Sequence, residues 1–221
     1  MFDIQSLILD LPLNRGGNNR DAFTEKPKNI VVIGSSGAGK TTLINFIKNG
    51  TELVKQNHVF VPKRYITREK RLGDDLVENQ HTTEENFAML VMDNEINVHW
   101  ERDLGGSKRE HYGFASAVNE EGVLLYSANN AIVRPNVNLH PKQFLENSLI
   151  IGVYLPDDTR TARFGERSPD LKKDKQHEVA KRLSDSSDNI LQYSDIIIDN
   201  SAPPEQVGQT FASLLKKLIY I

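Results

Sequence analysis

The 221-residue chain contains no cysteine, which excludes disulfide bonds, thiolate catalysis and Cys-ligated zinc or iron–sulfur sites. It also lacks a strong charge imbalance, since 27 basic and 30 acidic residues give a formal net charge of −3. Any anion-binding site must therefore be local. No apolar run approaches the roughly 18 residues that span a bilayer, and no signal-peptide pattern precedes Arg15. We expect a cytoplasmic protein with neither nucleic acid nor a membrane as partner.

Short apolar segments alternate with amphipathic ones through residues 29–221, which predicts an α/β fold. Residues 1–28 combine a short apolar patch with a polar stretch rich in glycine and asparagine, and are predicted to be an N-terminal extension or linker. The spacing between strands is too long for hairpins, so we expect a mainly parallel sheet with helices on both faces. Strands are predicted at residues 30–33, 59–61, 98–100, 122–127, 149–155 and 195–199, and helices at 41–48, 84–92, 128–134, 159–167, 176–184 and 205–218.

Residues 34–41, GSSGAGKT, match the phosphate-binding P-loop pattern G-x-x-x-x-G-K-[ST]. They follow an apolar strand and precede a helix, so their backbone N–H groups and the positive helix end converge on one spot. We expect Lys40 to neutralise the β- and γ-phosphate oxygens of ATP or GTP, and the Thr41 hydroxyl to complete the shell of Mg²⁺. The residues predicted to contact the nucleotide are Gly34, Ser35, Ser36, Gly37, Ala38, Gly39, Lys40, Thr41 and Thr42.

The rest of the sequence helps to decide which molecule receives the γ-phosphate of the nucleotide. The tetrapeptide N-K-x-D, with which signalling GTPases read guanine, is absent. The strand predicted at residues 122–127 ends in Tyr126-Ser127, where ATPase motors normally have an aspartate. A small phosphotransferase is therefore the best interpretation.

An arginine cluster follows within residues 64–75, RYITREKRLGDD. Arg68 and Arg71 stand three residues apart beside Gly73, a spacing that suits bidentate binding of a phosphate group on an acceptor molecule. Most such clusters lie on the surface, so a solvated charge run is the alternative at this point.

With these motifs in this order, residues 29–218 resemble the guanylate-kinase-like P-loop kinases. GSSGAGKTTL is followed by T-R-x-x-R-x-G and then by Tyr112-Gly113. Within this superfamily the chain is most similar to the ribose 1,5-bisphosphate phosphokinases, which form phosphoribosyl pyrophosphate in phosphonate breakdown. The resemblance implies an acceptor-binding region at about 62–115 and a lid at about 156–182. The segments that carry the similarity are RYITR (64–68), ENQHTTEENF (78–87), VHW (98–100) and VLLYSANNAIV (123–133).

The sequence differs from the guanylate kinases at several positions that bind the acceptor in those enzymes. Guanylate kinases have a base-reading carboxylate at the position of His99 and a second near Tyr126-Ser127, and this chain has neither. Asn79 stands where a phosphate-binding tyrosine is expected, and Phe114 replaces a Ser or Thr. A site that reads a base through hydrogen bonds discriminates by orders of magnitude, so GMP is disfavoured as the acceptor.

The resemblance implies a kinase that transfers phosphate from ATP, with Mg²⁺, to a small phosphorylated substrate, best matched by ribose 1,5-bisphosphate. A nucleoside monophosphate kinase and a non-catalytic guanylate-kinase-like interaction module are the alternatives, and a homodimer stays open. Trp100 is predicted to pack in the core, and Arg160 and Arg163 lie in the lid region, for which a solvated helix face is the alternative. The predicted substrate-binding residues are Arg68, Arg71, His99 and Tyr112, and the predicted catalytic residues are Lys40, Arg167 and Arg182.

Overall fold

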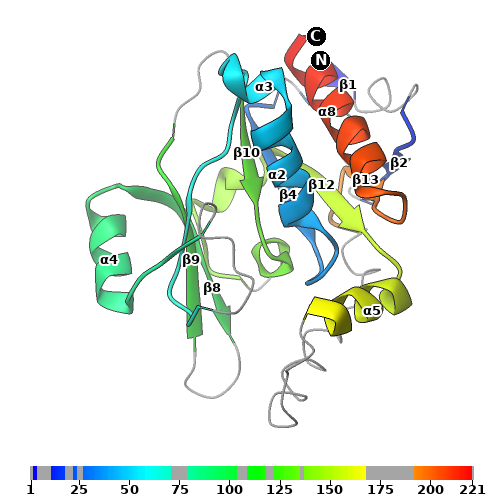
Figure 1. Ribbon diagram of the computed structural model, residues 1–221. Coiled ribbons are helices and arrows are strands. Elements are labelled where there is room, and N and C mark those ends of the chain that lie inside the picture. Colours follow the sequence, from blue (N-terminus) through cyan, green and yellow to red (C-terminus); the bar gives the residue numbers. More distant parts are fainter. Residues whose placement is uncertain are drawn as a thin grey trace.

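Two β-sheets packed against each other form the framework of the protein (Figure 1). The computed structural model describes residues 2–3, 11–17, 22–23, 27–70, 79–103, 109–117, 122–134, 137–167 and 192–220. Within these ranges, no helix has the length and apolar character needed to cross a membrane. Figure 1 shows helix α4 (Glu84–Met92) on the left beside a five-stranded sheet, and helices α2 (Lys40–Gly50) and α8 (Pro204–Tyr220) over a six-stranded sheet to its right.

The six-stranded sheet is built around β4 (Asn29–Gly34), which confirms the strand predicted at residues 30–33. Its isoleucine and valine residues are buried on both faces, as expected of a central parallel strand. All neighbouring pairs are parallel except β2 with β13, so the sheet is mixed. The strand order is β2 (Asn14–Arg15), β13 (Ile196–Asp199), β12 (Ser148–Tyr154), β4, β10 (Val123–Ser127) and β5 (Val59–Phe60).

Different elements cover the two faces of this sheet. On one face, Ile30 and Val32 pack against α2 and α8. On the opposite face, Val31 and Ile33 pack against the five-stranded sheet, with residues of the 3-10 helices η1 (Asn130–Val133) and η2 (Lys142–Phe144) in the same core. The expectation of helices on both faces is therefore corrected, because a second sheet covers one of them.

The five-stranded sheet is mostly antiparallel. Its β8 and β9 are consecutive antiparallel partners, so the prediction that excluded hairpins is wrong for this region. β9 is not found by a search for continuous apolar runs, because its sequence REHYGFA alternates charged or polar residues with aromatic ones. The strand order is β11 (Leu139–His140), β8 (Ile96–Asp103), β9 (Arg109–Ala115), β6 (Arg64–Ile66) and β7 (Asn79–His81), and only β6 and β7 run parallel.

Besides α2, which matches the helix predicted at 41–48, three of the predicted helices agree closely with the structure. The helix predicted at 84–92 is α4, whose N-cap Thr83 accepts a hydrogen bond from the Asn86 backbone N–H at 3.2 Å. In contrast, the segment predicted as a helix at 128–134 forms only the short η1. The helix predicted at 176–184 lies outside the described residues. The other agreements are α5 (Asp157–Arg167) and α8, and one short helix, α3 (Glu52–Lys55), was not predicted.

Residues before position 28 contribute to the six-stranded sheet. β2 pairs with β13, and Leu13 is buried in the core beneath α8. β1 (Phe2–Asp3) pairs with β3 (Ala22–Phe23) in a separate antiparallel pair. The boundary between an extension at 1–28 and a domain at 29–221 stays a prediction, although residues 13–15 already belong to the sheet and its core.

Candidate active site at the phosphate-binding loop

The P-loop connects the end of β4 to the start of α2, as the motif predicts. Gly37 and Gly39 have φ angles of +86° and +96°, in the left-handed region that favours glycine. A Cβ atom on Gly39 would lie 2.1 Å from the Asn200 Nδ2 atom, so this position also has no room for a side chain. Inside the loop, the Ala38 N–H donates to the Ser35 carbonyl at 3.1 Å. These features hold the loop in a compact shape.

Lys40 lies across this loop rather than in solvent. Its Nζ atom donates to the Gly34 carbonyl at 2.6 Å and to the Ser35 carbonyl at 3.1 Å. The ammonium group is therefore already within the loop where phosphate oxygens are expected to bind. A cation, backbone N–H groups and the amino end of α2 together fit the polyphosphate of a nucleotide.

Thr41 is the residue whose chemistry fits Mg²⁺. It is the second residue of α2, is partly exposed, and offers a hydroxyl oxygen. In the part of the chain that the structure describes, no group of three His, Cys, Asp or Glu side chains could hold a metal ion. Mg²⁺ commonly keeps several waters and binds through one or two protein oxygens plus phosphates, so the donor set fits an ion that arrives with a nucleotide.

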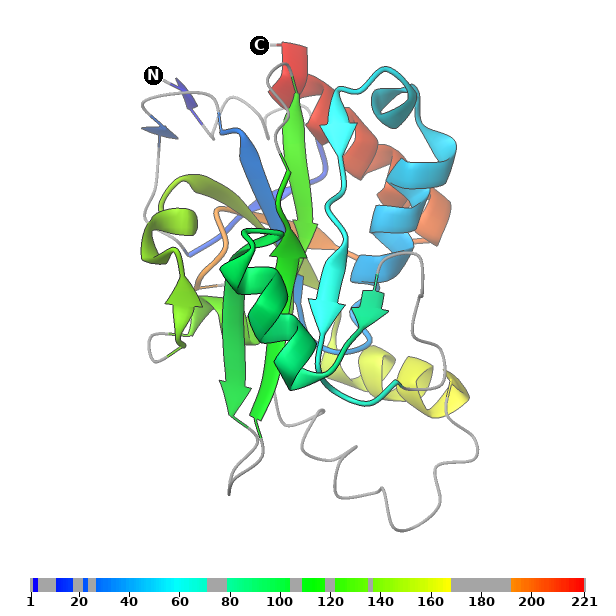
Figure 2. The ribbon, with the colours of Figure 1, turned by 90° about the vertical axis from the view of Figure 1, so that its left-hand side faces the viewer.

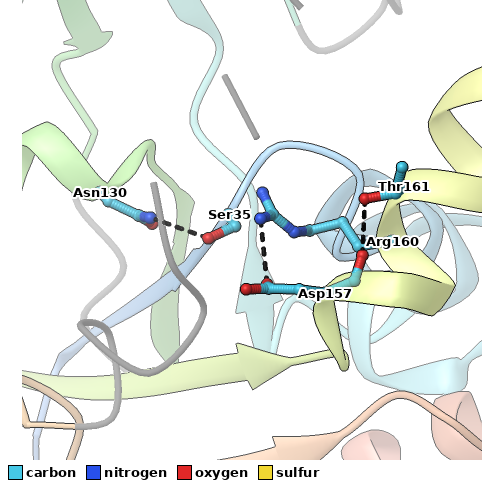
Figure 3. Close-up of polar contacts among 5 residues, drawn as sticks. All are labelled: Ser35, Asn130, Asp157, Arg160 and Thr161. Carbon is cyan, nitrogen blue, oxygen red and sulfur yellow. Dashed lines mark hydrogen bonds and ion pairs between the residues drawn. The ribbon is translucent and has the colours of Figure 1, made fainter. Parts of the chain in front are cut away.

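Two asparagines that follow strand ends hold the P-loop from outside. The Gly34 N–H donates to Asn130 Oδ1 at 3.0 Å, and Asn130 Nδ2 donates to Ser35 Oγ at 3.4 Å (Figure 3). Asn200 follows β13, and its Nδ2 atom donates to the Ala38 carbonyl at 2.6 Å. The sequence analysis missed both residues. Their position shortly after strands β10 and β13 is the signal that could have found them, because parallel strands meet the P-loop at their carboxyl ends.

Arg160 of α5 is fully buried against the same loop. Its NH2 atom forms an ion pair with Asp157 Oδ1 at 3.0 Å, and its Cγ atom lies 3.3 Å from where a Cβ on Gly37 would be (Figure 3). Arg163, one turn later, donates through NH2 to the Asn200 carbonyl at 3.3 Å. The first turns of α5 are thus fixed to the P-loop and to the end of β13. The alternative prediction that these arginines lie on a solvated helix face is wrong for Arg160, which is fully buried.

One face of the five-stranded sheet carries Tyr112, one of the predicted substrate-binding residues. Tyr112 is buried, stacks on Trp100 with ring centroids 5.5 Å apart, and donates its hydroxyl to Glu110 Oε2 at 2.5 Å. Burial and the neighbouring Glu110 raise the pKa of Tyr112, while Arg102 and Arg68 act in the opposite direction. Arg68 and Arg102 are therefore close enough to influence this hydroxyl electrostatically. Trp100 is fully buried, as predicted.

His99 lies on the opposite face of that sheet from Tyr112. In the β8–β9 ladder, His99 pairs with Gly113 whereas Trp100 pairs with Tyr112, so the two side chains point to opposite faces. His99 stacks on His140 with ring centroids 5.0 Å apart. Burial lowers the pKa of His99, with smaller contributions from His140 and His111 that Glu101 opposes. The structure does not bring His99 together with Tyr112 and Arg68.

The remaining predicted site residues are described only in part. Ser35 and Ala38 are buried in the loop, Ser36 and Thr42 are exposed, and the other P-loop residues are partly or fully buried. Arg68 follows β6, and its NH1 atom donates to the Glu69 carbonyl at 3.0 Å. Arg167 ends α5, but its side chain is outside the description, and Arg71 and Arg182 lie outside the described residues altogether.

Comparison with solved structures gives a clear result for the fold. The guanylate kinase from Anaplasma phagocytophilum superposes with a TM-score of 0.51, covering 87% of this chain and 87% of that chain at 15% sequence identity. The chain has a guanylate-kinase-like fold. At this identity the likeness concerns the fold alone. No protein-family model matches the chain, and no curated protein has a significantly similar sequence.

In this guanylate-kinase-like fold, the P-loop and the face that carries Tyr112 belong to different sheets, which meet at the carboxyl end of β10. Arg64 of β6 donates through NH1 to the Ser127 carbonyl at 2.6 Å, and Trp100 Nε1 donates to Asn129 Oδ1 at 3.2 Å. The next residue, Asn130, holds the P-loop. The short segment after β10 therefore contacts both halves of the candidate site.

Proposed function

We propose that this protein is an ATP-dependent phosphotransferase that acts on the phosphate group of a small acceptor. The observation that carries the proposal is the shape of the P-loop, with Lys40 already bonded to the Gly34 and Ser35 carbonyls. A scaffold that only binds a partner protein has no physical need for an ammonium group inside a ring of backbone N–H groups. The guanylate-kinase-like fold adds support, as does the second sheet, where Arg68 and Arg102 act electrostatically on Tyr112.

In the proposed reaction, an oxygen of the acceptor phosphate forms a bond to the γ-phosphorus of ATP. The bond from that phosphorus to the β–γ bridging oxygen breaks, and ADP leaves. The acceptor phosphate is already ionised at neutral pH, so no general base is required, and rate enhancement comes from positioning and electrostatics. Lys40 would stabilise the β- and γ-phosphate charge. Thr41, together with the nucleotide, would hold Mg²⁺, which would supply further charge neutralisation to the phosphates.

The proposed acceptor is ribose 1,5-bisphosphate, with phosphoribosyl pyrophosphate as product. Neither His99 nor Ser127 supplies the carboxylate that would read guanine, and the described carboxylate on the face that carries Tyr112, Glu110, is buried and bonded to Tyr112. Arginines beside Tyr112 suit an acceptor dominated by phosphate rather than by a base. Arg68 and Arg71 are proposed to hold the acceptor, and Arg167 and Arg182 to close over the transferring phosphoryl group.

An ADP-release assay with ATP and Mg²⁺ tests this function across ribose 1,5-bisphosphate, GMP, AMP, UMP and dTMP. We expect turnover with ribose 1,5-bisphosphate, and a rate that falls about 100-fold or more in Lys40→Ala. Lys55→Ala is the matched control, since Lys55 is exposed on α3 and pairs only locally with Glu52 at 2.7 Å. Turnover with GMP alone would contradict the proposed acceptor. Absence of turnover with every acceptor would contradict the phosphotransferase.

A further inference from the structure

Arg64 occupies the junction between the two halves of the candidate site, and no role has been assigned to it above. It is the first residue of β6 and is partly exposed. Its Nε atom donates to Asn79 Oδ1 at 2.9 Å, and its NH1 atom donates to the Ser127 carbonyl at 2.6 Å. Two hydrogen bonds from different edges of the guanidinium fix the plane of the group.

The Ser127 carbonyl places Arg64 next to the P-loop end of the six-stranded sheet. Ser127 is the last residue of β10, and β10 pairs with β4, the strand that leads into the P-loop. Three residues after Ser127, Asn130 accepts a hydrogen bond from the Gly34 N–H. Arg64 and the first residue of the P-loop motif therefore contact the same short segment of chain.

The register of the five-stranded sheet places Arg64 on the face that carries Tyr112. Arg64 pairs with Phe114, and Ile66 pairs with Tyr112, in the antiparallel β6–β9 ladder. Residues that face each other across a ladder point to the same side of the sheet, so Arg64 shares a face with Tyr112. Arg68, which influences the Tyr112 hydroxyl, follows the same strand.

Both hydrogen-bond partners named for Arg64 are neutral oxygens. The Asn79 amide is buried, and the Ser127 carbonyl belongs to the backbone, so these two hydrogen bonds orient the guanidinium from well-fixed positions. A guanidinium that is oriented in advance binds a phosphate group with less loss of side-chain entropy than a freely rotating one. Arg64 contacts the segment that also holds the P-loop, and Arg68 follows the same strand, so Arg64 lies beside both parts of the proposed phosphate-transfer site.

We infer that Arg64 binds the acceptor phosphate that receives the γ-phosphoryl group, and that Asn79 is the positioning residue that orients it. This inference rests on the proposed function. It also gives a reason why this chain has Asn79 where the guanylate kinases are expected to have a tyrosine. In this arrangement, the amide oxygen of Asn79 turns the arginine toward the acceptor instead of contacting the phosphate itself.

Equilibrium dialysis of radiolabelled inorganic phosphate tests the inference, with the P-loop filled by a non-hydrolysable ATP analogue and Mg²⁺. We expect Arg64→Lys to weaken phosphate binding at least about tenfold, because lysine cannot make both orienting hydrogen bonds, while analogue affinity changes less than about twofold. Arg109→Lys is the matched control, because Arg109 is exposed, pairs with Glu101 at 3.1 Å and lies on the opposite face of the same sheet.

A second variant distinguishes phosphate binding by Arg64 from a purely structural role of its hydrogen bond to Asn79. Asn79→Asp keeps an oxygen for the Arg64 Nε atom and adds a negative charge, so a purely structural bridge would be kept or strengthened. If Arg64 binds the acceptor phosphate, Asn79→Asp should weaken phosphate binding, because the new carboxylate competes with phosphate for the Arg64 guanidinium. Phosphate binding equal to wild type in both variants, or none in the wild type, would overturn the role of Arg64. Failure of the wild type to bind the ATP analogue would instead overturn the proposed function.

Discussion

At the scale of single residues, the P-loop depends on glycines whose replacement would meet two separate obstacles. Gly39 has a φ angle of +96°, which is strained for any residue with a Cβ atom. The Asn200 amide fills the space beside it and bonds to the Ala38 carbonyl, so the loop and the end of β13 fit each other at this point. Gly39 is therefore required both for the backbone conformation of the loop and for its close packing against Asn200.

Replacing Gly39 by alanine is expected to destabilise the loop and to weaken nucleotide binding. The left-handed φ costs about 1 to 3 kcal/mol for a residue with a side chain, and the clash with Asn200 adds to that cost. Thermal unfolding and MgADP titration measure the two effects. Gly50→Ala is the control, since Gly50 ends α2 and an added Cβ would meet no atom within 4 Å. Equal melting temperatures and equal MgADP affinities in the two variants would contradict this account.

At the scale of elements, the antiparallel contact of β8 with β11 brings two histidines face to face. His140 pairs with His99 in the ladder, and their rings stack 22° from parallel. Phe87 of α4 lies over the same face, 6.4 Å from the His99 ring and 5.7 Å from the His111 ring, and Figure 2 shows α4 lying across this side of the sheet. Burial and two neighbouring imidazoles disfavour a positive charge on His99.

This histidine arrangement predicts a loss of stability in mild acid. The pKa of His99 in the folded chain is below its usual value of 6.5, so the unfolded chain binds more protons in this range. The free energy of unfolding should be highest above pH 6.5 and should fall as the pH drops from 6.5 toward the lowered pKa of His99, below which the loss levels off. Urea unfolding between pH 7.5 and pH 5 measures the slope. His99→Gln should flatten it, whereas His58→Gln, at a histidine that packs on Tyr220 elsewhere in the fold, should not. An unchanged slope in His99→Gln would be inconsistent with the prediction.

Elements with continuous apolar runs or clear capping signals could be predicted from the sequence, and those with weaker patterns could not. β4 and β12 are almost entirely aliphatic, and α4 begins at a threonine cap, so their positions follow from local physics. β9 has no continuous apolar run, because charged residues, a histidine and a glycine surround its Tyr and Phe, and only its pairing with β8 identifies it as a strand. The segment 128–134 has helical composition, but contacts with the P-loop and with Trp100 leave it as the short η1.

At the scale of the whole molecule, the candidate site is assembled where the two sheets meet. The P-loop half could be predicted because its residues are contiguous and its glycines have a mechanical reason. The supporting residues Asn130, Arg160 and Asn200 were missed because they come from three distant segments and no fixed sequence spacing relates them to Gly34. For the two asparagines, only their position after a strand of the same sheet offered a signal. Sheet register was missed as well, and it separates His99 from Tyr112 although both were expected in one substrate site.

The central claim is that residues 34–41 bind the phosphates of a nucleotide, and calorimetric titration of MgATP tests it most directly. The wild-type protein should bind MgATP with a measurable heat. Lys40→Ala should weaken binding by roughly a factor of 10 to 100, as expected for the loss of charge-assisted hydrogen bonds to phosphate, while Lys55→Ala should bind as the wild type does. MgATP affinity in Lys40→Ala equal to that of the wild type, or no binding by either, would contradict the account.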